Sequence, residues 1–367
     1  MKVAFRVDAG SEMGGGHLFR CMSIASELMR RGVENCYFVM RYHHKQFVLD
    51  VEAAGYHVVV IPLEFEPDYY SGDYTQWIGG TVKTDVDVTV TELQNLGFSD
   101  KDWLVVDHYG LDETFENPIK SLGVQVAIID DLVNRRHQCN LLIDQTCGRE
   151  THEYRALVNE EALVCAGQQY CILRPEFLSW RDTSLERRES FSSIKNIIVN
   201  FGSTDPLNIT SSVMNDIEDY CIDLDVSVNV VLSSSAPHLR EVEKQLSLSK
   251  IRDVALHIDA TNVAELMAKA DIAIGAAGST TWERCALGLP TLLVKTAENQ
   301  TDVIEKVVSL GAAVFHDLKA PDQVAEFNRG FSKLTREYQQ LSRRSSTLVD
   351  GRGLQRVVDA LFQGTVN

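Results

Sequence analysis

Long apolar runs are missing from this sequence. No stretch of its 367 residues approaches the roughly 20 consecutive apolar residues that a membrane-spanning helix needs. The first ten residues, MKVAFRVDAG, lack the apolar segment of a signal peptide. We therefore expect a cytoplasmic protein that has no membrane partner.

The spacings typical of metal and disulfide sites are also missing. The eight cysteines include no C-x-x-C pair and no zinc-like spacing, so we expect reduced and mostly buried thiols. No Lys-Ser/Thr follows the first glycine loop, which excludes a Walker loop, and its spacing is not that of an ordinary dinucleotide site. The sequence predicts neither a metal nor a cofactor.

Basic residues are fewer than acidic residues. There are 35 Lys and Arg against 52 Asp and Glu, a formal net charge of -17, which argues against nucleic acid as the main partner. An acidic protein can still bind a small phosphate-bearing ligand through backbone N–H groups and helix ends.

What the sequence does contain is a regular alternation of apolar, strand-like runs with helical patterns. In the first half the runs are KVAFRVD, CYFVMR, HVVVIPL, WLVVDHY, VQVAIIDD and CNLLIDQ. Residues 17–30 have helical periodicity, with one apolar face. Continuous apolar strands separated by helices predict a parallel sheet that is covered on both sides.

The alternation stops at residues 174–194, which are rich in charge and serine, and then restarts with NIIVNFG, VSVNVVLS, VALHIDA, DIAIGAAG, PTLLVKT and AAVFHD. We expect an N-terminal Rossmann-like domain over 1–173, a linker over 174–194 and a second Rossmann-like domain over 195–334. The remaining residues, 335–367, are predicted to be a helical segment that is interrupted near Gly351. The fold class is α/β, with two doubly wound halves facing across a cleft that the carboxyl ends of their strands line.

The first strand leads into the loop AGSEMGGGHLFRC, where Gly14, Gly15 and Gly16 precede His17. A helix N-terminus carries about half a positive charge and unpaired N–H donors, so these glycines are suited to bind a phosphate. The same dipole favours a neutral imidazole at His17, which can accept a proton. The alternative is a glycine turn with a histidine that only caps the helix.

A second glycine loop occurs in DIAIGAAGSTTWERCALGLP, residues 271–290. Gly278, Ser279 and Thr280 can bind a diphosphate, and the Glu283 carboxylate can accept two ribose hydroxyls. The alternative is a capping box formed by Thr280 and Glu283, which needs no ligand.

Three further strand ends carry polar residues. NFGSTDP offers Gly202 and Ser203 as another phosphate-binding loop or a simple turn. VVDHY ends with Tyr109, either a substrate contact or a half-buried wall, and TAENQTD offers Asn299 at a cleft edge or a helix start.

Taken together, these motifs resemble a known family. RVDAGSEMGGGHLFRCMSIASEL, LVVDHYGLD, IIDDLVNRRHQCNLLIDQ, LRPEF, NFGSTDPLNIT, GAAGSTTWERCALGLP and AENQ match, in order and approximate spacing to about residue 315, the UDP-2,4-diacetamido-2,4,6-trideoxy-β-L-altropyranose hydrolases of pseudaminic acid biosynthesis. That family is in turn similar to the GT-B glycosyltransferase that adds N-acetylglucosamine to the peptidoglycan lipid precursor.

The resemblance implies a UDP-sugar substrate, with UDP held mainly by the second half. Water, with His17 as its base, would attack the anomeric carbon and displace UDP with inversion, without a metal. The remaining implied contacts are Glu283 with the ribose; Gly202, Ser203, Gly278, Ser279 and Thr280 with the diphosphate; and Tyr109 and Asn299 with the sugar. The family usually has a double glycine before Ser-Asp where this chain reads FGST. Additional residues near 63–100 and at the C-terminus are also unexplained.

Other functions are compatible with the same scaffold. A GT-B glycosyltransferase would use an acceptor hydroxyl in place of water, and a non-catalytic UDP-sugar binding protein would bind without turnover. A sugar-nucleotide 2-epimerase would need a second set of acid/base carboxylates, which the sequence does not show.

Overall fold

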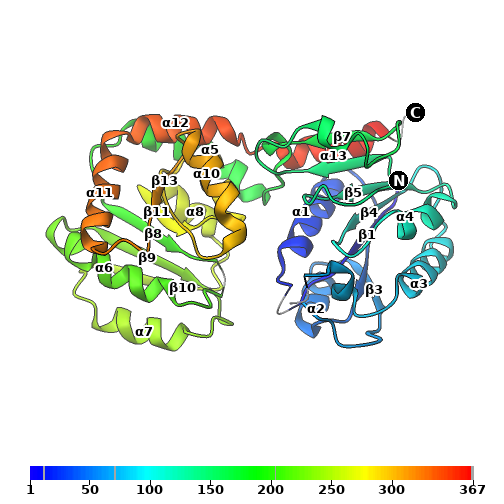
Figure 1. Ribbon diagram of the computed structural model, residues 1–367, viewed down its shortest axis with the longest axis horizontal. Coiled ribbons are helices and arrows are strands. Elements are labelled where there is room, and N and C mark those ends of the chain that lie inside the picture. The colour runs from blue at the N-terminus through cyan, green and yellow to red at the C-terminus, as the bar shows by residue number, and fades with distance from the viewer. Residues whose placement is uncertain (11–12, 70–71, 203, 365–367) are drawn as a thin grey trace. The chain divides into compact units, whose positions relative to one another are not determined.

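The computed structural model describes residues 1–10, 13–69, 72–202 and 204–364, without the side chain of Asn299. The chain forms two compact units: unit 1 contains Met1–Arg174 and Arg352–Asn367, and unit 2 contains Pro175–Gly351. Figure 1 shows unit 1 in blue to teal with its C-terminal helix in red, and unit 2 in green to orange.

Unit 1 is built on a parallel sheet with the strand order β3-β2-β1-β4-β5-β6-β7. Its strands are β1 (Val3–Val7), β2 (Cys36–Arg41), β3 (His57–Ile61), β4 (Trp103–Asp107), β5 (Gln125–Ile129), β6 (Leu141–Asp144) and β7 (Leu163–Ala166). Its helices are α1 (Gly16–Arg30), α2 (Lys45–Ala53), α3 (Val82–Asn95), α4 (Glu113–Lys120) and α13 (Gly353–Gly364), with 3-10 turns η1 (Tyr74–Ile78), η2 (Thr151–Tyr154) and η3 (Gln168–Tyr170).

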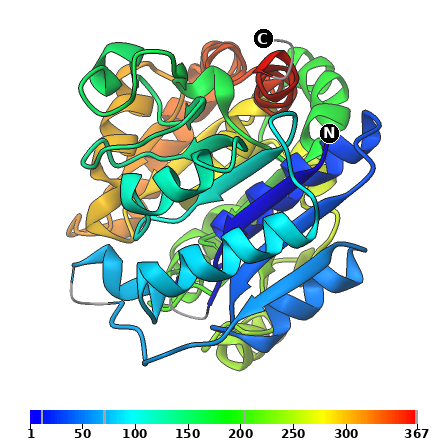
Figure 2. The same ribbon diagram turned by 90° about the vertical axis from the view of Figure 1, so that its right-hand side faces the viewer.

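The two faces of this sheet are both buried, because side chains alternate along each strand. Val3, Phe5 and Val7 of β1 pack in one core with α1 and α13. Ala4 points to the other face, where the core includes residues of α3 and α4. Figure 2 shows this second face with the long helix α3 (cyan) in front of the strands.

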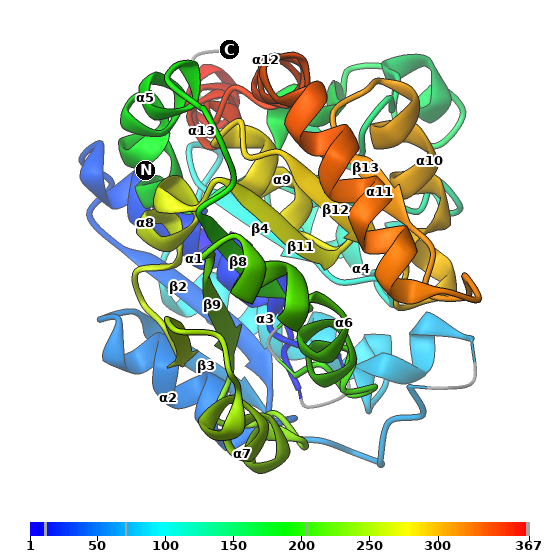
Figure 3. The ribbon, with the colours of Figure 1, turned by 90° about the vertical axis from the view of Figure 1, so that its left-hand side faces the viewer.

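Unit 2 repeats the plan with the order β10-β9-β8-β11-β12-β13, again all parallel. Its strands are β8 (Asn196–Asn200), β9 (Ser227–Leu232), β10 (Val254–Ile258), β11 (Ile272–Ala276), β12 (Thr291–Val294) and β13 (Val314–His316). Its helices are α5 (Pro175–Glu189), α6 (Ile209–Asp223), α7 (Leu239–Leu248), α8 (Val263–Lys269), α9 (Thr280–Ala286), α10 (Thr301–Ser309), α11 (Gln323–Arg336) and α12 (Tyr338–Leu348), with the turn η4 (Glu298–Gln300). In Figure 3, α6 and α11 lie in front of β8 and β11.

Both sheets reverse their strand order at one place, between β1 and β4 in unit 1 and between β8 and β11 in unit 2. In open α/β sheets the loops at the carboxyl ends of strands beside such a switch point are where ligands bind. All twelve strand-like runs expected from the sequence are confirmed as strands; β7 was not predicted.

The segment 174–194 is different from the expected linker, because most of it is helix α5, which belongs to unit 2. Its Arg188 is buried and donates to the carbonyls of Leu287, Ala270 and Met267. The charge of Arg188 therefore serves buried hydrogen bonds, whereas Asp182, Glu186 and Glu189 of the same stretch are exposed. The C-terminal residues are also not one segment, since α12 packs in unit 2 and α13 in unit 1.

Two further expectations concern membrane-spanning helices and the burial of the cysteines. Among the described residues no helix is both long and apolar enough to cross a membrane. All eight cysteines are buried except Cys147, which is half-buried, in agreement with the prediction of mostly buried thiols.

Candidate active site

The glycine loop after β1 brings His17 to the switch point of unit 1. Gly14 has a φ of +77°, a left-handed conformation that favours glycine, and exchanges backbone hydrogen bonds with Gly10. Helix α1 then begins at Gly16, and its N-cap Gly15 offers no side-chain hydrogen bond. His17 thus lies in the first turn, where the helix has N–H groups not used by a side-chain cap.

His17 pairs with the last residue of the neighbouring strand β4. Its Nδ1 lies 2.5 Å from Oδ1 of Asp107, a contact between residues 90 positions apart in the sequence. Burial alone would raise the pKa of Asp107, but Arg20 and His17 hold it well below its ordinary value, so the carboxyl is ionised. Because a carboxylate can only accept, we assign the proton of this hydrogen bond to Nδ1, which leaves Nε2 as an acceptor.

Arg20, one helical turn after His17, completes this cluster. Its Nε and Nη2 donate to the two oxygens of Asp107 at 2.5 and 2.6 Å, a bidentate pair. The same Nη2 lies 3.0 Å from His17 Nδ1. Since Nδ1 carries a proton, this is a contact and not a hydrogen bond. The carboxylate of Asp107 is therefore held in place from two sides.

Tyr109 packs against His17 with ring centroids 4.7 Å apart in an edge-on arrangement. Burial, and then the carboxylate of Asp131, raise the pKa of Tyr109, so the phenol stays protonated at neutral pH. Tyr109 in turn contacts Tyr74 and Trp77, at 5.0 and 6.0 Å between centroids. These two rings come from the additional residues near 63–100, which thus supply an aromatic support for Tyr109.

A buried network of charges adjoins the cluster through His108. Arg6 pairs bidentately with Asp8 at 2.6 and 2.8 Å and donates to Asp85 at 2.6 Å. Arg41 also donates to Asp85, at 2.7 Å, and His108 Nε2 lies 3.2 Å from Asp8. Burial would raise the pKa of Asp8, but Arg6 holds it well below its ordinary value. Two cations and two anions thus balance in a site with almost no exposure to water.

The other predicted residues lie in unit 2, at the carboxyl ends of three neighbouring strands. Gly202 follows β8, Gly278 follows β11, and the turn η4 follows β12. Ser203 and the side chain of Asn299 lie outside the described part of the chain. The loop after β8 contains Asp205, which caps α6 by accepting from the N–H groups of Ile209 and Thr210.

The loop after β11 does not form the capping box of Thr280 and Glu283 that was the alternative to a diphosphate site. Ser279 is the N-cap of α9 and makes no side-chain capping hydrogen bond, and Thr280 is already the first residue of the helix. Gly278 and Ser279 are exposed, while Thr280 and Glu283 are half-buried. The loop therefore keeps its backbone donors and hydroxyls at the surface of unit 2.

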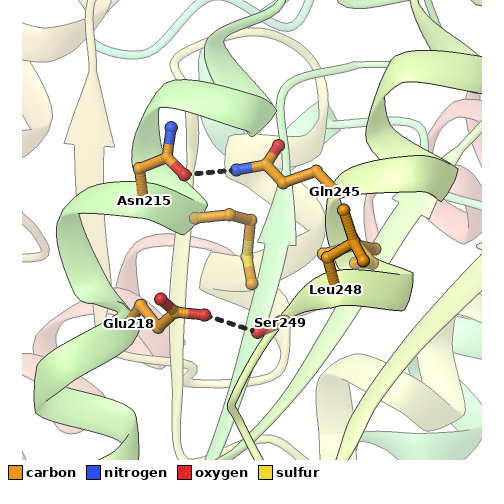
Figure 4. Close-up of a pocket in the computed structure, with 7 residues that line it drawn as sticks. Asn215, Glu218, Gln245, Leu248 and Ser249 are labelled. Carbon is orange, nitrogen blue, oxygen red and sulfur yellow. Dashed lines mark hydrogen bonds between the residues drawn. The ribbon is translucent and has the colours of Figure 1, made fainter.

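A separate pocket lies between α6 and α7 (Figure 4). It is lined by Met214, Asn215, Glu218, Gln245, Leu246, Leu248 and Ser249. Gln245 donates to Asn215 at 2.7 Å, and Ser249 donates to Glu218 at 2.9 Å. Its polar groups are thus paired with one another, and it contains none of the predicted site residues.

Sequence reasoning singled out His17, Tyr109 and the strand end at Asp107 but missed Arg20. The signal for Arg20 was its spacing, since residues three apart share one face of a helix. The signal for the buried network was an arginine inside an apolar strand: Arg6 and Asp8, two apart, point to the same face of the sheet.

No family model matches this chain. It is 26% identical over 305 residues to the uncharacterized protein MJ1062 of Methanocaldococcus jannaschii, covering 82% of this chain and 57% of that protein. This chain therefore spans little more than half of that relative's length.

A second relative is the UDP-2,4-diacetamido-2,4,6-trideoxy-β-L-altropyranose hydrolase of Campylobacter jejuni. It is 27% identical over 281 residues, or 76% of this chain and 86% of that protein, which confirms the resemblance read from the motifs. Among solved structures, MurG of Acinetobacter baumannii superposes with a TM-score of 0.69 at 14% identity, over 99% of this chain and 100% of that one. The fold is GT-B-like, with two doubly wound Rossmann-like units.

Proposed function

We propose that this protein hydrolyses a UDP-sugar, and specifically UDP-2,4-diacetamido-2,4,6-trideoxy-β-L-altropyranose. The products are UDP and the free 2,4-diacetamido-2,4,6-trideoxy-L-altrose, a reaction of pseudaminic acid biosynthesis. The name of the Campylobacter jejuni relative supports the substrate. The observation that carries the chemistry is the His17–Asp107 pair, which leaves His17 Nε2 as a proton acceptor beside a strand switch point.

In this proposal His17 acts as the general base. Water forms a bond to the anomeric carbon from the face opposite UDP, and its proton moves to Nε2 of His17. The bond between the anomeric carbon and the UDP oxygen breaks, so UDP leaves as an anion and the configuration inverts. Asp107 keeps the imidazole in the required tautomer and stabilises the imidazolium that forms.

The remaining roles follow from the resemblance to the hydrolase family. Glu283 binds the ribose, and Tyr109 and Asn299 contact the sugar. Backbone and hydroxyl groups of the loops after β1, β8 and β11 flank the phosphates; these residues are Gly14, Gly15, Gly16, Gly202, Ser203, Gly278, Ser279 and Thr280. Gly278 and Ser279 are exposed, and no capping box occupies the start of α9. Both observations support the assignment of this loop to the phosphates.

The test is UDP release from the proposed substrate with no acceptor and with EDTA present. We expect rapid release by the wild-type protein and its loss in His17→Phe, with UDP binding retained. His57→Phe is the matched control, because His57 is exposed and begins β3, whereas the site lies at the carboxyl ends of the strands. NMR of the first-formed anomer should show inversion.

Each alternative outcome has a definite meaning. Release that requires an added acceptor would identify a GT-B glycosyltransferase. UDP binding without any turnover would identify a binding protein, and equal release by His17→Phe would remove His17 from the mechanism.

A further inference from the structure

Arg284 is a buried cation with spare hydrogen-bond donors. It lies on α9 and is 1% exposed. Its Nη2 donates to the carbonyl of Ala276 at 2.6 Å and to Thr281 Oγ1 at 3.2 Å. Its Nε and Nη1, also buried, find no hydrogen-bond partner among the described residues.

The guanidinium lies at the switch point of unit 2. Gly275 and Asn200 are paired neighbours at the ends of β11 and β8. A Cβ added to Gly275 would be 2.5 Å from Arg284 Nη1 and 2.4 Å from the carbonyl oxygen of Asn200. The positive charge is therefore packed where both glycine loops of unit 2 begin.

The carboxylate of Glu283, the preceding residue, attracts this charge. No carboxylate in the described part of the chain forms an ion pair with Arg284, and the carboxylate of Asp205 in the adjoining loop is engaged by the N-terminus of α6. Burial lowers the pKa of Arg284 to about 10, so it is still charged at neutral pH. A buried cation that forms no ion pair among the described residues, and that leaves Nε and Nη1 without acceptors, is costly. This cost calls for an explanation.

We propose that Arg284 is a positioning residue that attracts the phosphate groups of a nucleotide to the loops after β8 and β11. It acts through the field of its charge and through the Ala276 carbonyl that it holds, because its own nitrogens are covered by protein. The low dielectric around it strengthens its attraction for an anion at the loop surface. This inference rests on the proposed function for the identity of the nucleotide, UDP.

The test compares ligands that differ in charge. Dissociation constants for UDP, uridine and pyrophosphate are measured by calorimetry with wild-type protein, Arg284→Met and Arg284→Lys. We expect Arg284→Met to reduce the preference for UDP over uridine by roughly tenfold or more, with uridine affinity unchanged, and Arg284→Lys to retain most of the preference. A purely structural role would weaken both ligands equally.

Two further variants keep the test decisive. Arg187→Met removes a charge of the same sign from unit 2. Arg187 pairs with Asp271, which directly precedes β11 at the amino end of the sheet. The preference for UDP over uridine should therefore not change in this variant. If Arg284→Met does not fold, Arg284→Gln, which keeps a donor for the Ala276 carbonyl, takes its place.

A folded neutral variant with an unchanged preference would overturn the proposal, and so would a wild-type protein that binds neither UDP nor pyrophosphate. Pyrophosphate binding that depends on Arg284, without UDP binding, would support this inference while refuting the proposed nucleotide. UDP binding without hydrolysis would refute only the proposed reaction.

Discussion

Replacing Asp107 by asparagine tests the tautomer of His17 directly. Asp107 Oδ2 accepts from Arg20 Nε at 2.5 Å, while Oδ1 faces both His17 Nδ1 and Arg20 Nη2. If the amide NH2 of the variant takes the Oδ2 position, it meets an arginine N–H that cannot accept. In the other orientation it also meets an arginine N–H, Arg20 Nη2, but only there can it donate to His17, provided that Nδ1 becomes the acceptor and the proton moves to Nε2.

The favoured orientation therefore removes the proposed base without removing the side chain. General acid–base catalysis typically contributes about 10² to 10⁴ in rate. We expect kcat for UDP release to fall by roughly this factor, because Nε2 can no longer accept the proton of water. The Michaelis constant should change little, since the nucleotide is proposed to bind in unit 2.

The assay is steady-state UDP release, with UDP affinity measured in parallel. Asp102→Asn serves as the control, because Asp102 is also buried but directly precedes β4, whereas Asp107 is its last residue. A kcat of Asp107→Asn within about threefold of wild type would refute the assigned tautomer and role. An equal loss in Asp102→Asn would show that both effects come from altered packing.

Three other predictions concern the supports of the two sites. Gly275→Ala should lower the free energy of unfolding by about 1–3 kcal/mol, measured by urea denaturation, because the new Cβ would lie 2.5 Å from Arg284 Nη1. Asp8→Asn should cost about 3 kcal/mol at pH 7. The folded-state pKa of Asp8 is depressed, so its contribution is present above about pH 4 and is lost as pH falls; the variant should unfold with a shallower pH dependence over this range. Trp77→Ala removes a ring that packs on Tyr109 and should lower kcat for UDP release without changing UDP affinity.

The architecture followed from local patterns. Each of the twelve apolar runs contains a strand. The apolar face predicted for residues 17–30 is largely the buried face of α1: Leu18, Cys21, Ala25 and Leu28 are buried and Met22 is half-buried, but Met29 is exposed. Such periodicities depend only on neighbours in the chain, so they can be read from a single sequence. The same reasoning failed at 174–194, where charged residues indicated a linker but Arg188 is buried by hydrogen bonds to carbonyls that are distant in sequence.

By itself, the sequence determined two doubly wound halves, a glycine loop that positions His17 at a helix start, and polar residues at several strand ends. Only the tertiary structure decided which of these meet. Asp107 reaches His17 because β4 pairs directly with β1, and this strand order is set by packing and not by position in the chain. Likewise, nothing around Arg284 in the sequence shows that its charge is buried against Gly275. Contacts between residues far apart along the chain depend on the order in which the strands pair, and local composition does not determine that order.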